Sequence, residues 1–428
     1  MKTEIGHYTV DGKIYTSKFE AILASNLSKK EIKWHFFDDV FSKANWMEEP
    51  ELALDDFYRI RAQQIRNQYD YIIVFCSGGS DSNNVIRTFL NNKIKVDEVM
   101  ALAPMSGLKN FDFSASNLDE SNTISETKFA LLPLLDEIRN ADSSIKITIN
   151  DFFEDIIKYK DEHWTFNAAG NIVTVLTSHF TDVLKFPHIE KLVNQGKRIG
   201  LVYGSDKPII RINPRGHLYF VLSDSGINYL NMPNERANPL IDRVLFYWSP
   251  ELPELLVKQA HVIKKVISLP QYDFIKKYFE QKPDDQSKHT LADYRRYQEK
   301  NNYKQIITKE YIFNRFAPNK IRESAPTLMF EGRSKYERAI VPFIYPTTSD
   351  TNLFQCQKVD ANAGLFTRDQ QWLHQLHGNT RISEMVMSGL KELYKSIPEN
   401  YLNINGTGMI YHYQAYKFGE IKDFIPTK

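Results

Sequence analysis

The pattern of apolar and polar positions in the first part of the chain changes between the spacing of strands and that of helices. Residues 6–16 alternate around Asp11-Gly12, which predicts a β-hairpin. A capping box then predicts a short helix, and residues 32–38 favour another short strand. After Pro50, apolar side chains recur at helical spacing, and the arginines of this segment are expected largely off its apolar face. They are Arg59, Arg61 and Arg66.

Strand and helix patterns then alternate over residues 71–204. The apolar run YIIVF (71–75) is uninterrupted, as in a strand covered on both faces. Further strands are predicted at 96–103, 145–150 and 198–204. Strands separated by helices predict a parallel sheet with right-handed crossovers, and therefore an α/β fold. The helices are expected directly after the first strand, from Thr123 to about Arg139, near 151–159 and 171–185, and over 188–195.

Smaller elements are expected after this α/β region. Residues 208–222 predict a hairpin, and Ser249-Pro250 has the residue types that begin a helix. The polar stretch 281–304 contains the best candidate for a linker, and the remainder mixes helix with short strands. We therefore expect a small N-terminal region, a central domain and a C-terminal α+β region. Their ranges are 1–48, 49–270 and 271–428.

Composition narrows the class of protein. The chain has 428 residues, 42% of them hydrophobic, which is enough for a large core in more than one domain. Its formal net charge of +1 does not favour nucleic acid or an anionic membrane as a partner. One basic cluster is read either as a local binding patch or as a solvated face. It comprises Lys320, Arg322, Arg333, Lys335 and Arg338.

Cysteine usage and the apolar runs bear on the compartment. The two cysteines, Cys76 and Cys356, form no CxxC pair, which disfavours a cysteine-based zinc site, an iron–sulfur cluster and a disulfide framework. Such usage suits a reducing compartment, and Cys76 is expected to be buried. The sequence shows neither a signal peptide nor a run of apolar residues that could span a membrane. These features predict a soluble, cytoplasmic protein without a membrane partner.

The richest chemistry follows the first predicted strand, in the stretch VFCSGGSDSNN (74–84). In open α/β sheets, ligands bind at the carboxyl ends of the strands. Glycines let backbone N–H groups approach an anion closely, and the start of a helix adds unpaired donors and a positive dipole end. Asp81 would repel phosphate unless a Mg²⁺ ion lay between them. A strand-to-helix turn with a serine cap is the alternative interpretation.

Residues 77–82 resemble the pyrophosphate loop (PP-loop) of the ATP pyrophosphatase superfamily, whose pattern is SGGxDS. The resemblance implies a doubly wound parallel sheet of the adenine nucleotide alpha hydrolase-like (HUP) type, with ATP and Mg²⁺ as ligands. It also implies that ATP is cleaved between the α and β phosphates and that AMP passes to a carboxylate or carbonyl oxygen. A nucleophile, often ammonia or an amine, then displaces AMP. The implied nucleotide-binding residues are Ser77, Gly78, Gly79, Ser80, Asp81 and Ser82.

A second stretch, YGSDKP (203–208), ends the fourth predicted strand and resembles the Gly-Ser-Asp of the asparagine synthetase domain. This resemblance, which covers roughly residues 50–270, implies that Asp206 and Asp81 flank one metal ion. The family pattern continues with an acid, whereas Lys207 stands here and could neutralise pyrophosphate. An ordinary turn is again the alternative. The resemblance also implicates Gly204 and Ser205 at the pyrophosphate, and Leu102 and Ala103 at the adenine.

The leading hypothesis is an AMP-forming synthetase that adenylates a small-molecule carboxylate and forms an amide with an amine or ammonia. Asp81, Asp206 and Lys207 are its expected catalytic residues. Asparagine synthetases begin with a glutaminase domain whose nucleophile is an N-terminal cysteine, and this chain begins Met-Lys-Thr without one. An enzyme that modifies nucleobases or nucleic acids and a nucleotide-binding regulatory protein without turnover stay open. The substrate, the nucleophile and the oligomeric state are left undetermined.

Other polar and aromatic residues have two interpretations each. The aromatic run 246–248 precedes a helix that bears Lys258, Gln259 and His261. It predicts either a substrate wall or polar pocket near the nucleotide, or a core aromatic cluster beside a solvated helix face. His179, on an apolar helix face, is typical of a core histidine.

Overall fold

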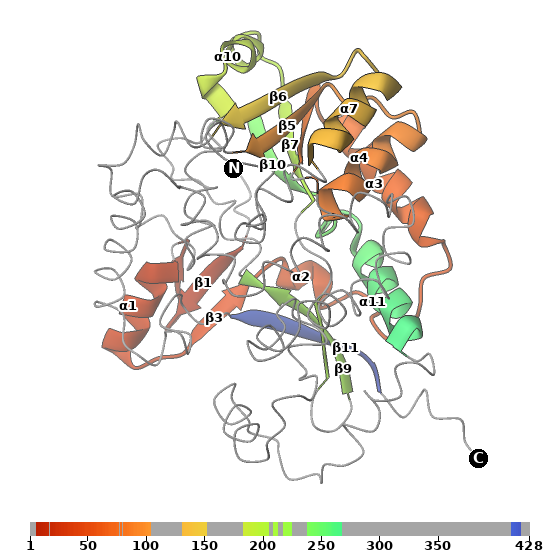
Figure 1. Cartoon of the computed structure of the whole chain (residues 1–428). Helices are drawn as coiled ribbons and strands as arrows, with labels where there is room; N and C mark the ends of the chain where they lie inside the picture. The colour runs from red at the N-terminus through yellow and green to blue at the C-terminus, as the bar shows by residue number, and fades with distance from the viewer. Residues whose placement is uncertain are drawn as a thin grey trace, which may run out of the picture.

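A five-stranded sheet with all strands parallel is the centre of the upper half of the molecule in Figure 1. The computed structural model describes residues 6–16, 18–76, 78, 80–103, 131–151, 183–204, 209–212, 217–224, 238–267 and 412–420. The strand order is β10-β7-β4-β5-β6. The strands are β4 (Tyr71–Cys76), β5 (Glu98–Ala103), β6 (Lys146–Asp151), β7 (Ile199–Tyr203) and β10 (Ile241–Leu245). The predicted α/β class is confirmed, while the assignment to the HUP type stays a prediction.

The direction in which strands are added reverses at β4. Strands β5 and β6 lie on one side of it, and β7 and β10 lie on the other. Because all five strands are parallel, the carboxyl ends of β4 and β7 are neighbours at one edge of the sheet. In open α/β sheets, such a reversal point is where ligands bind.

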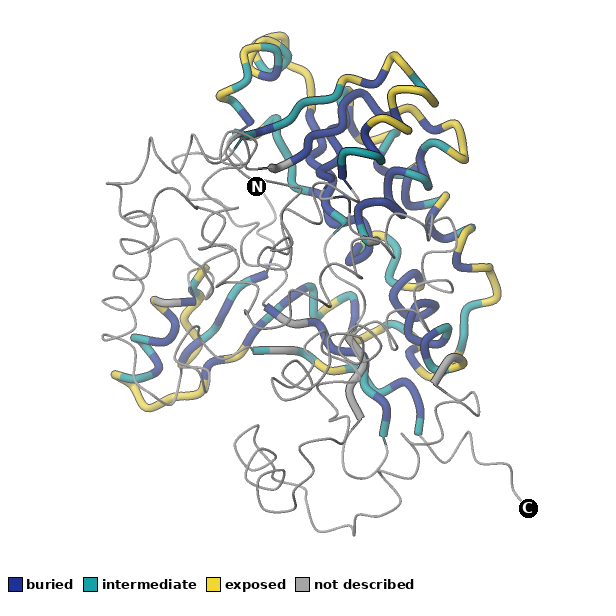
Figure 2. The backbone as a smooth tube through the Cα atoms, viewed as in Figure 1, coloured by how far each residue is buried: buried dark blue, intermediate teal, exposed yellow. Residues whose placement is uncertain are grey.

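Helices complete this α/β unit. In Figure 1, α3 (Leu54–Gln68), α4 (Ser80–Asn91) and α7 (Leu132–Ala141) lie together beside the sheet, and α10 (Pro187–Asn194) lies apart from them near β6. The strands and the facing sides of these helices form the buried core that Figure 2 shows in dark blue. The apolar side chains at helical spacing along α4 face the core. They are Val85, Ile86 and Phe89, and Leu90 is partly buried.

The helix predicted at Ser249-Pro250 begins later than expected. Helix α11 (Pro253–Ile267) starts three residues further on, with Pro253 as its first residue. The residues before it form a turn, in which the backbone N–H of Leu252 donates to the carbonyl of Ser249 at 3.3 Å. Proline suits the first position of a helix because the N–H that it lacks would have no partner there. The predicted start was therefore wrong, although the helix exists.

A small antiparallel sheet, β2-β1-β3, is formed by the N-terminal residues. It contains β1 (His7–Val10), β2 (Lys13–Tyr15) and β3 (Ile32–His35), with α1 (Lys18–Ser28) and α2 (Asp38–Phe41) beside it in sequence. Val10 pairs with Lys13, so the hairpin turn contains two residues. Asp11 and Gly12 both have positive φ, 49° and 78°, as the tightest hairpin turns require. The predicted hairpin is confirmed.

A second three-stranded antiparallel sheet has the order β11-β9-β8. Strands β8 (Ile209–Ile212) and β9 (His217–Ser223) form the predicted hairpin, and β11 (Tyr413–Glu420) pairs with β9 from a distant part of the chain. This sheet packs on the N-terminal region through Trp46, whose ring stacks on Phe220 at 5.2 Å and on Tyr416 at 4.8 Å between centroids. The division of the chain into three domains stays a prediction.

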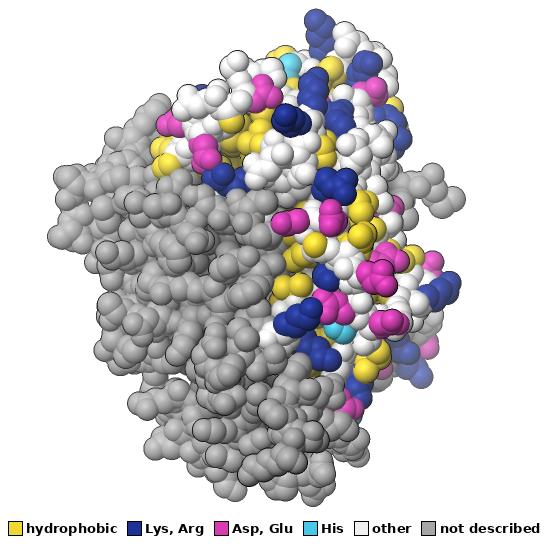
Figure 3. All heavy atoms as spheres, turned by 90° about the vertical axis from the view of Figure 1, so that its right-hand side faces the viewer, with side chains coloured by type: hydrophobic (Ala, Val, Ile, Leu, Met, Phe, Trp, Pro, Cys, Tyr) yellow, Lys and Arg dark blue, Asp and Glu magenta, His cyan; other side chains and the backbone are white. Residues whose placement is uncertain are grey.

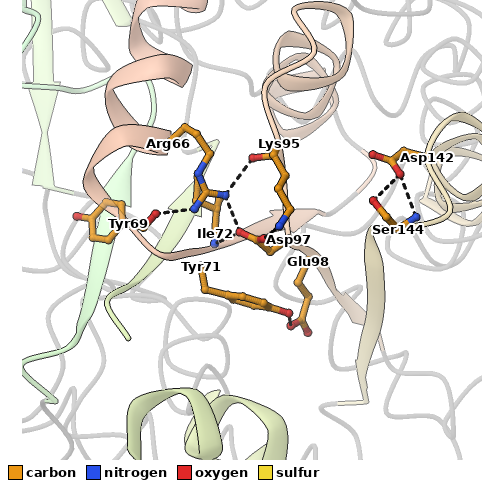
Figure 4. A network of polar contacts seen from close by, with 9 residues as sticks. All are labelled: Arg66, Tyr69, Tyr71, Ile72, Lys95, Asp97, Glu98, Asp142 and Ser144. Atoms are coloured by element: carbon orange, nitrogen blue, oxygen red, sulfur yellow. Dashed lines mark hydrogen bonds and ion pairs between the residues drawn. The ribbon is translucent and has the colours of Figure 1, made fainter. Parts of the chain in front are cut away.

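The amino-terminal edge of the parallel sheet is held by a polar network (Figure 4). Arg66 on α3 donates to the carboxylate of Asp97 at 2.6 Å and to the carbonyl of Lys95 at 3.2 Å. Asp97 also accepts the backbone N–H of Ile72 at 2.9 Å. The hydroxyl of Tyr71 donates to Glu98 at 2.9 Å. The network therefore ties α3 to both β4 and β5 at the edge opposite the predicted phosphate loop.

One prediction about α3 was wrong. Arg61 was expected largely off the apolar face, yet it is 3% exposed. Its guanidinium donates to the carbonyl of Leu245 at 3.1 Å, at the carboxyl end of β10, and lies 3.4 Å from the carboxylate of Glu251. A buried guanidinium is tolerated where acceptors receive its N–H groups. The spacing of apolar residues along the chain cannot predict such a contact of a charged side chain.

Candidate functional site

The predicted phosphate loop begins where β4 ends. Gly78 is buried and has a φ of +83°, in the left-handed region that favours glycine. Helix α4 begins at Ser80, so that Asp81 and Ser82 lie in its first turn. The expected order of buried strand, glycine turn and helix is therefore confirmed. Ser77, Gly79 and the side chain of Ser80 lie outside the described residues.

The tip of β7 touches the start of α4. A Cβ atom added to Gly204 would lie 3.0 Å from the carbonyl carbon and oxygen of Asp81 and 3.1 Å from the Cα of Ser82. These distances are tighter than most real Cβ contacts, so a larger residue here would require the backbone of α4 to shift by a few tenths of an ångström. The structure thus brings together the first residue of the second motif and the acid of the first. Ser205, Asp206 and Lys207 lie outside the described residues.

The rings of Phe75, the next-to-last residue of β4, and Tyr203, the last residue of β7, stack near the carboxyl ends of these neighbouring strands. Their centroids are 4.5 Å apart and their planes are inclined by 8°. Both side chains are buried, with exposed fractions of 7% and 6%. An aromatic pair of this kind fixes the separation of two strand ends, because offset stacking adds to the burial of both rings. The two strand ends that carry the candidate site are therefore held at a fixed separation.

The aromatic run 246–248 belongs to the buried core, and one of its residues also contacts the loop. Phe246, Tyr247 and Trp248 are all buried. The hydroxyl of Tyr247 donates to the backbone carbonyl of Asp81 at 2.7 Å and accepts from the amide of Asn84 at 3.0 Å. The core interpretation is confirmed for the rings. The hydroxyl contact was missed, since nothing in the residue pattern marks it.

The polar residues of α11 are buried, so the expected solvated helix face was wrong. Lys258, Gln259 and His261 are 8%, 0% and 6% exposed. Lys258 donates to Glu49 at 2.8 Å, Gln259 donates to the hydroxyl of Tyr58 at 3.1 Å, and His261 Nε2 lies 2.9 Å from the carbonyl of Trp46. Each of these three side chains is therefore hydrogen-bonded to another part of the protein.

Burial sets the protonation of two groups in this region. It lowers the pKa of His261, so the ring is neutral near pH 7 and its Nε2–H donates to the carbonyl of Trp46. Burial is also the main cause that raises the pKa of Tyr58 well above its usual value. Asp55 and Asp81 raise it further by their charge. Tyr58 therefore stays a neutral phenol.

The end of β5, where the adenine was expected, lies at the same edge of the sheet. Leu102 and Ala103 are its last residues, and they pair with Asn150 and Asp151 at the end of β6. Asn150 is 3% exposed. The carboxyl ends of β4, β5, β6 and β7 thus form one continuous edge, with the phosphate loop near its middle.

The remaining candidates are weaker. Cys76 is buried, as predicted, whereas His179, Cys356 and the basic cluster at 320–338 lie outside the described residues. Within the described ranges, no group of three or more His, Cys, Asp or Glu side chains is arranged to hold a metal ion. Among the described helices, none combines the length and the apolar character needed to cross a bilayer. The described part of the face in Figure 3 mixes acidic, basic and apolar side chains.

Comparison with known proteins identifies no family. No family model matches this chain, and neither a curated protein nor a solved structure matches it significantly.

Proposed function

We propose that this chain is an ATP-dependent, AMP-forming synthetase that adenylates a small carboxylate and passes the acyl group to an amine or ammonia. One observation supports the proposal above the others, namely the close approach of Gly204 to Asp81 and Ser82. Two motifs that resemble the PP-loop and the Gly-Ser-Asp of asparagine synthetases are far apart in sequence. Their contact lies at the point where the strand order reverses, which is where an α/β sheet binds ligands.

The described residues fit a triphosphate bound with magnesium. The candidate loop leads into the N-terminal end of α4, where the positive end of the helix dipole favours an anion. Asp81 lies in the first turn of this helix, and its carboxylate suits Mg²⁺, which prefers oxygen ligands. Asp206 is the second acid that we assign to the metal. The ion would neutralise phosphate charge and make Asp81 compatible with an anion.

The protein's own contribution is positioning and charge stabilisation. Backbone donors of the loop hold the phosphates, and Lys207 stabilises the charge that grows on pyrophosphate as it leaves. The carboxylate of the acceptor substrate attacks the α-phosphate and forms an acyl adenylate. The amine then attacks the acyl carbon, and AMP leaves with the electron pair of the broken bond. No general base is assigned to any described residue.

The test is a reaction of the full chain with ATP, Mg²⁺ and a panel of carboxylates and amines, read by mass spectrometry. We expect AMP and pyrophosphate in equal amounts, and no product when EDTA removes the metal. Steady release of ADP would contradict the proposal. Tight binding of ATP without release of pyrophosphate would point instead to the regulatory alternative.

A matched pair of variants localises the activity. Asp81→Asn keeps the shape of the side chain but removes its charge, and should lower the rate of pyrophosphate release on the order of 100-fold. Asp39→Asn makes the same change at an exposed position of α2 and should leave the rate unchanged. Equal activity of the two variants would exclude Asp81 from the site.

A further inference from the structure

Three strand ends meet at the first turn of α4. Strand β4 leads into this helix through Gly78, β7 touches it at Gly204, and β10 reaches it through Tyr247. In the sheet, β10 is separated from β4 by β7. Tyr247 therefore reaches past the end of a neighbouring strand, and both it and Gly204 approach the backbone of Asp81.

The hydrogen bonds at Tyr247 have a defined direction. An amide NH₂ can only donate, so Asn84 donates to the phenol oxygen at 3.0 Å. The phenol proton then points to the carbonyl of Asp81 at 2.7 Å. Asn84 and Tyr247 are both 0% exposed, so water does not compete for these bonds. A chain of polarised hydrogen bonds thus runs from the second turn of α4 through Tyr247 and back to its first turn.

The segment that carries Tyr247 is itself firmly held. The backbone N–H of Phe246 donates to the carbonyl of Tyr203 at 3.0 Å, which extends the pairing of β10 with β7. The guanidinium of Arg61 donates to the carbonyl of Leu245, two residues before Tyr247. The hydroxyl of Ser249 donates to Glu251 at 2.6 Å, which fixes the turn beyond. The residues on both sides of Tyr247 are therefore held in place, so its hydroxyl can in turn hold the first turn of α4.

From this geometry we propose that Tyr247 is a positioning residue, which holds the first turn of α4 in the orientation that phosphate binding requires. The inference rests on the proposed function, since it assigns the phosphate contacts to this turn. Tyr247 touches neither the reacting atoms nor the metal in this account. It acts through the Asp81 carbonyl, whose peptide plane shares its rigid geometry with the N–H of Ser82. A shift of this plane would misalign a donor aimed at phosphate.

The experiment compares Tyr247→Phe with Tyr71→Phe. Both variants lose one tyrosine hydroxyl that donates a hydrogen bond, but the bond of Tyr71 goes to Glu98 at the opposite edge of the sheet. Amide hydrogen exchange over residues 80–86 is measured without nucleotide. Calorimetric titration with Mg–ATP then gives the dissociation constant, and steady-state kinetics give kcat and KM. Each variant is measured at the same number of degrees below its own unfolding midpoint.

We expect exchange at residues 84–86, whose N–H groups donate to the carbonyls of the first turn of α4, to rise about 5- to 10-fold in Tyr247→Phe, the equivalent of one lost hydrogen bond. The dissociation constant for Mg–ATP should rise by a similar factor, and both values should stay near those of the wild type in Tyr71→Phe. Unchanged exchange in Tyr247→Phe, or an equal rise in both variants, would overturn the inference. So would faster exchange with unchanged affinity.

The two proposals fail in different ways. A wild-type chain that makes no AMP and pyrophosphate would contradict the synthetase. The exchange measurement needs no nucleotide and decides by itself whether Tyr247 holds α4.

Discussion

At the scale of single residues, the site depends on positions where a side chain has no room. Gly204 is the clearest case, because an added Cβ would meet backbone atoms of Asp81 at 3.0 Å. Backbone in the first turn of a helix cannot rotate aside as a side chain can. A side chain at this position would therefore require the start of α4 to move by a few tenths of an ångström.

Gly204→Ala is predicted to displace the first turn of α4. Overpacking of this kind costs about 1–3 kcal/mol of stability. The affinity for Mg–ATP should fall about 10-fold or more, because the loop donors move with the turn. Thermal unfolding and calorimetric titration check the two effects.

Gly419→Ala is the matched control for this change. Its added Cβ would meet atoms even closer, at 2.6 and 2.9 Å, but they belong to the flexible end of the Lys264 side chain, which can move. Its affinity for Mg–ATP should equal that of the wild type. A similar loss of affinity in both variants would show that the close approach at Gly204 has no special role.

Residue patterns predict some of these positions and not others. The glycine turn after β4 follows from its sequence, because glycine is the residue that adopts positive φ at low cost. The burial of Arg61 does not follow, since a periodicity argument assigns charged residues to the solvent side. The hydrogen bond from Tyr247 to Asp81 does not follow from the sequence either, because it joins residues 166 positions apart.

At the scale of elements, polar contacts join α3 to the carboxyl end of one strand and to the amino end of another. Arg61 reaches the carboxyl end of β10, and Arg66 reaches Asp97 at the amino end of β5. Burial by itself would raise the pKa of Asp97, but hydrogen bonds from Arg66, Lys95 and the backbone of Ile72 outweigh it and lower the pKa. The carboxylate is therefore ionised at neutral pH.

Asp97→Ala is predicted to loosen α3 from β4 and β5. It leaves the N–H of Ile72 and the guanidinium of Arg66 without their shared acceptor, which should cost about 2–4 kcal/mol. Urea unfolding at pH 7 measures the loss. Asp136→Ala removes an exposed partner of Arg139 on α7 and should cost well under 1 kcal/mol. Equal midpoints for the two variants would contradict this account of the network.

Patterns along the chain predicted the strands β4, β5, β6 and β7 of the parallel sheet but not β10. Its residues, IDRVL, include an acid and a base, and no strand was expected there. β10 is an edge strand, so polar side chains are tolerated on it where the central β4 admits almost none. The order of the strands in the sheet also cannot be predicted from the spacing of apolar residues, because pairing depends on contacts between distant segments.

At the scale of the whole molecule, Asp224 joins three distant parts of the chain. Its buried carboxylate accepts the hydroxyl of Tyr8 at 2.9 Å, pairs with Lys18 at 2.8 Å and accepts the backbone N–H of His412 at 3.2 Å. Burial by itself would raise the pKa of Asp224, but the charge of Lys18 and the contacts of His412 outweigh it, and the pKa is lowered.

Asp224→Asn is predicted to destabilise the fold by about 3–5 kcal/mol at pH 7, because it leaves the buried ammonium of Lys18 uncompensated. Asp242→Asn, which breaks the more exposed pair with Arg198, should cost no more than about 1 kcal/mol. Urea midpoints provide the comparison. A loss for Asp224→Asn as small as that for Asp242→Asn would refute the argument.

The ion pair of Asp224 with Lys18 also predicts that the stability of the fold depends on pH. Because the folded pKa of Asp224 lies below its unfolded value of about 4, its stabilisation is complete above that pH. It is lost as the pH falls through the lower folded value. The difference in stability between wild type and Asp224→Asn should therefore be constant from pH 7 to pH 5 and should shrink below about pH 4. A difference that shrinks between pH 7 and pH 5 would assign the effect to another group.

The pairing of β9 with β11 has a consequence for how the chain is made. Asp224, which directly follows β9, and His412 are 188 positions apart. Strand β9 and Asp224 are therefore synthesised long before β11 and His412 leave the ribosome. The parallel sheet draws all its strands from residues 71–245 and can assemble during that interval, since domains fold as units as they emerge. Until translation reaches β11, β9 presents an unpaired edge, and this nascent species is where we expect chaperones to bind.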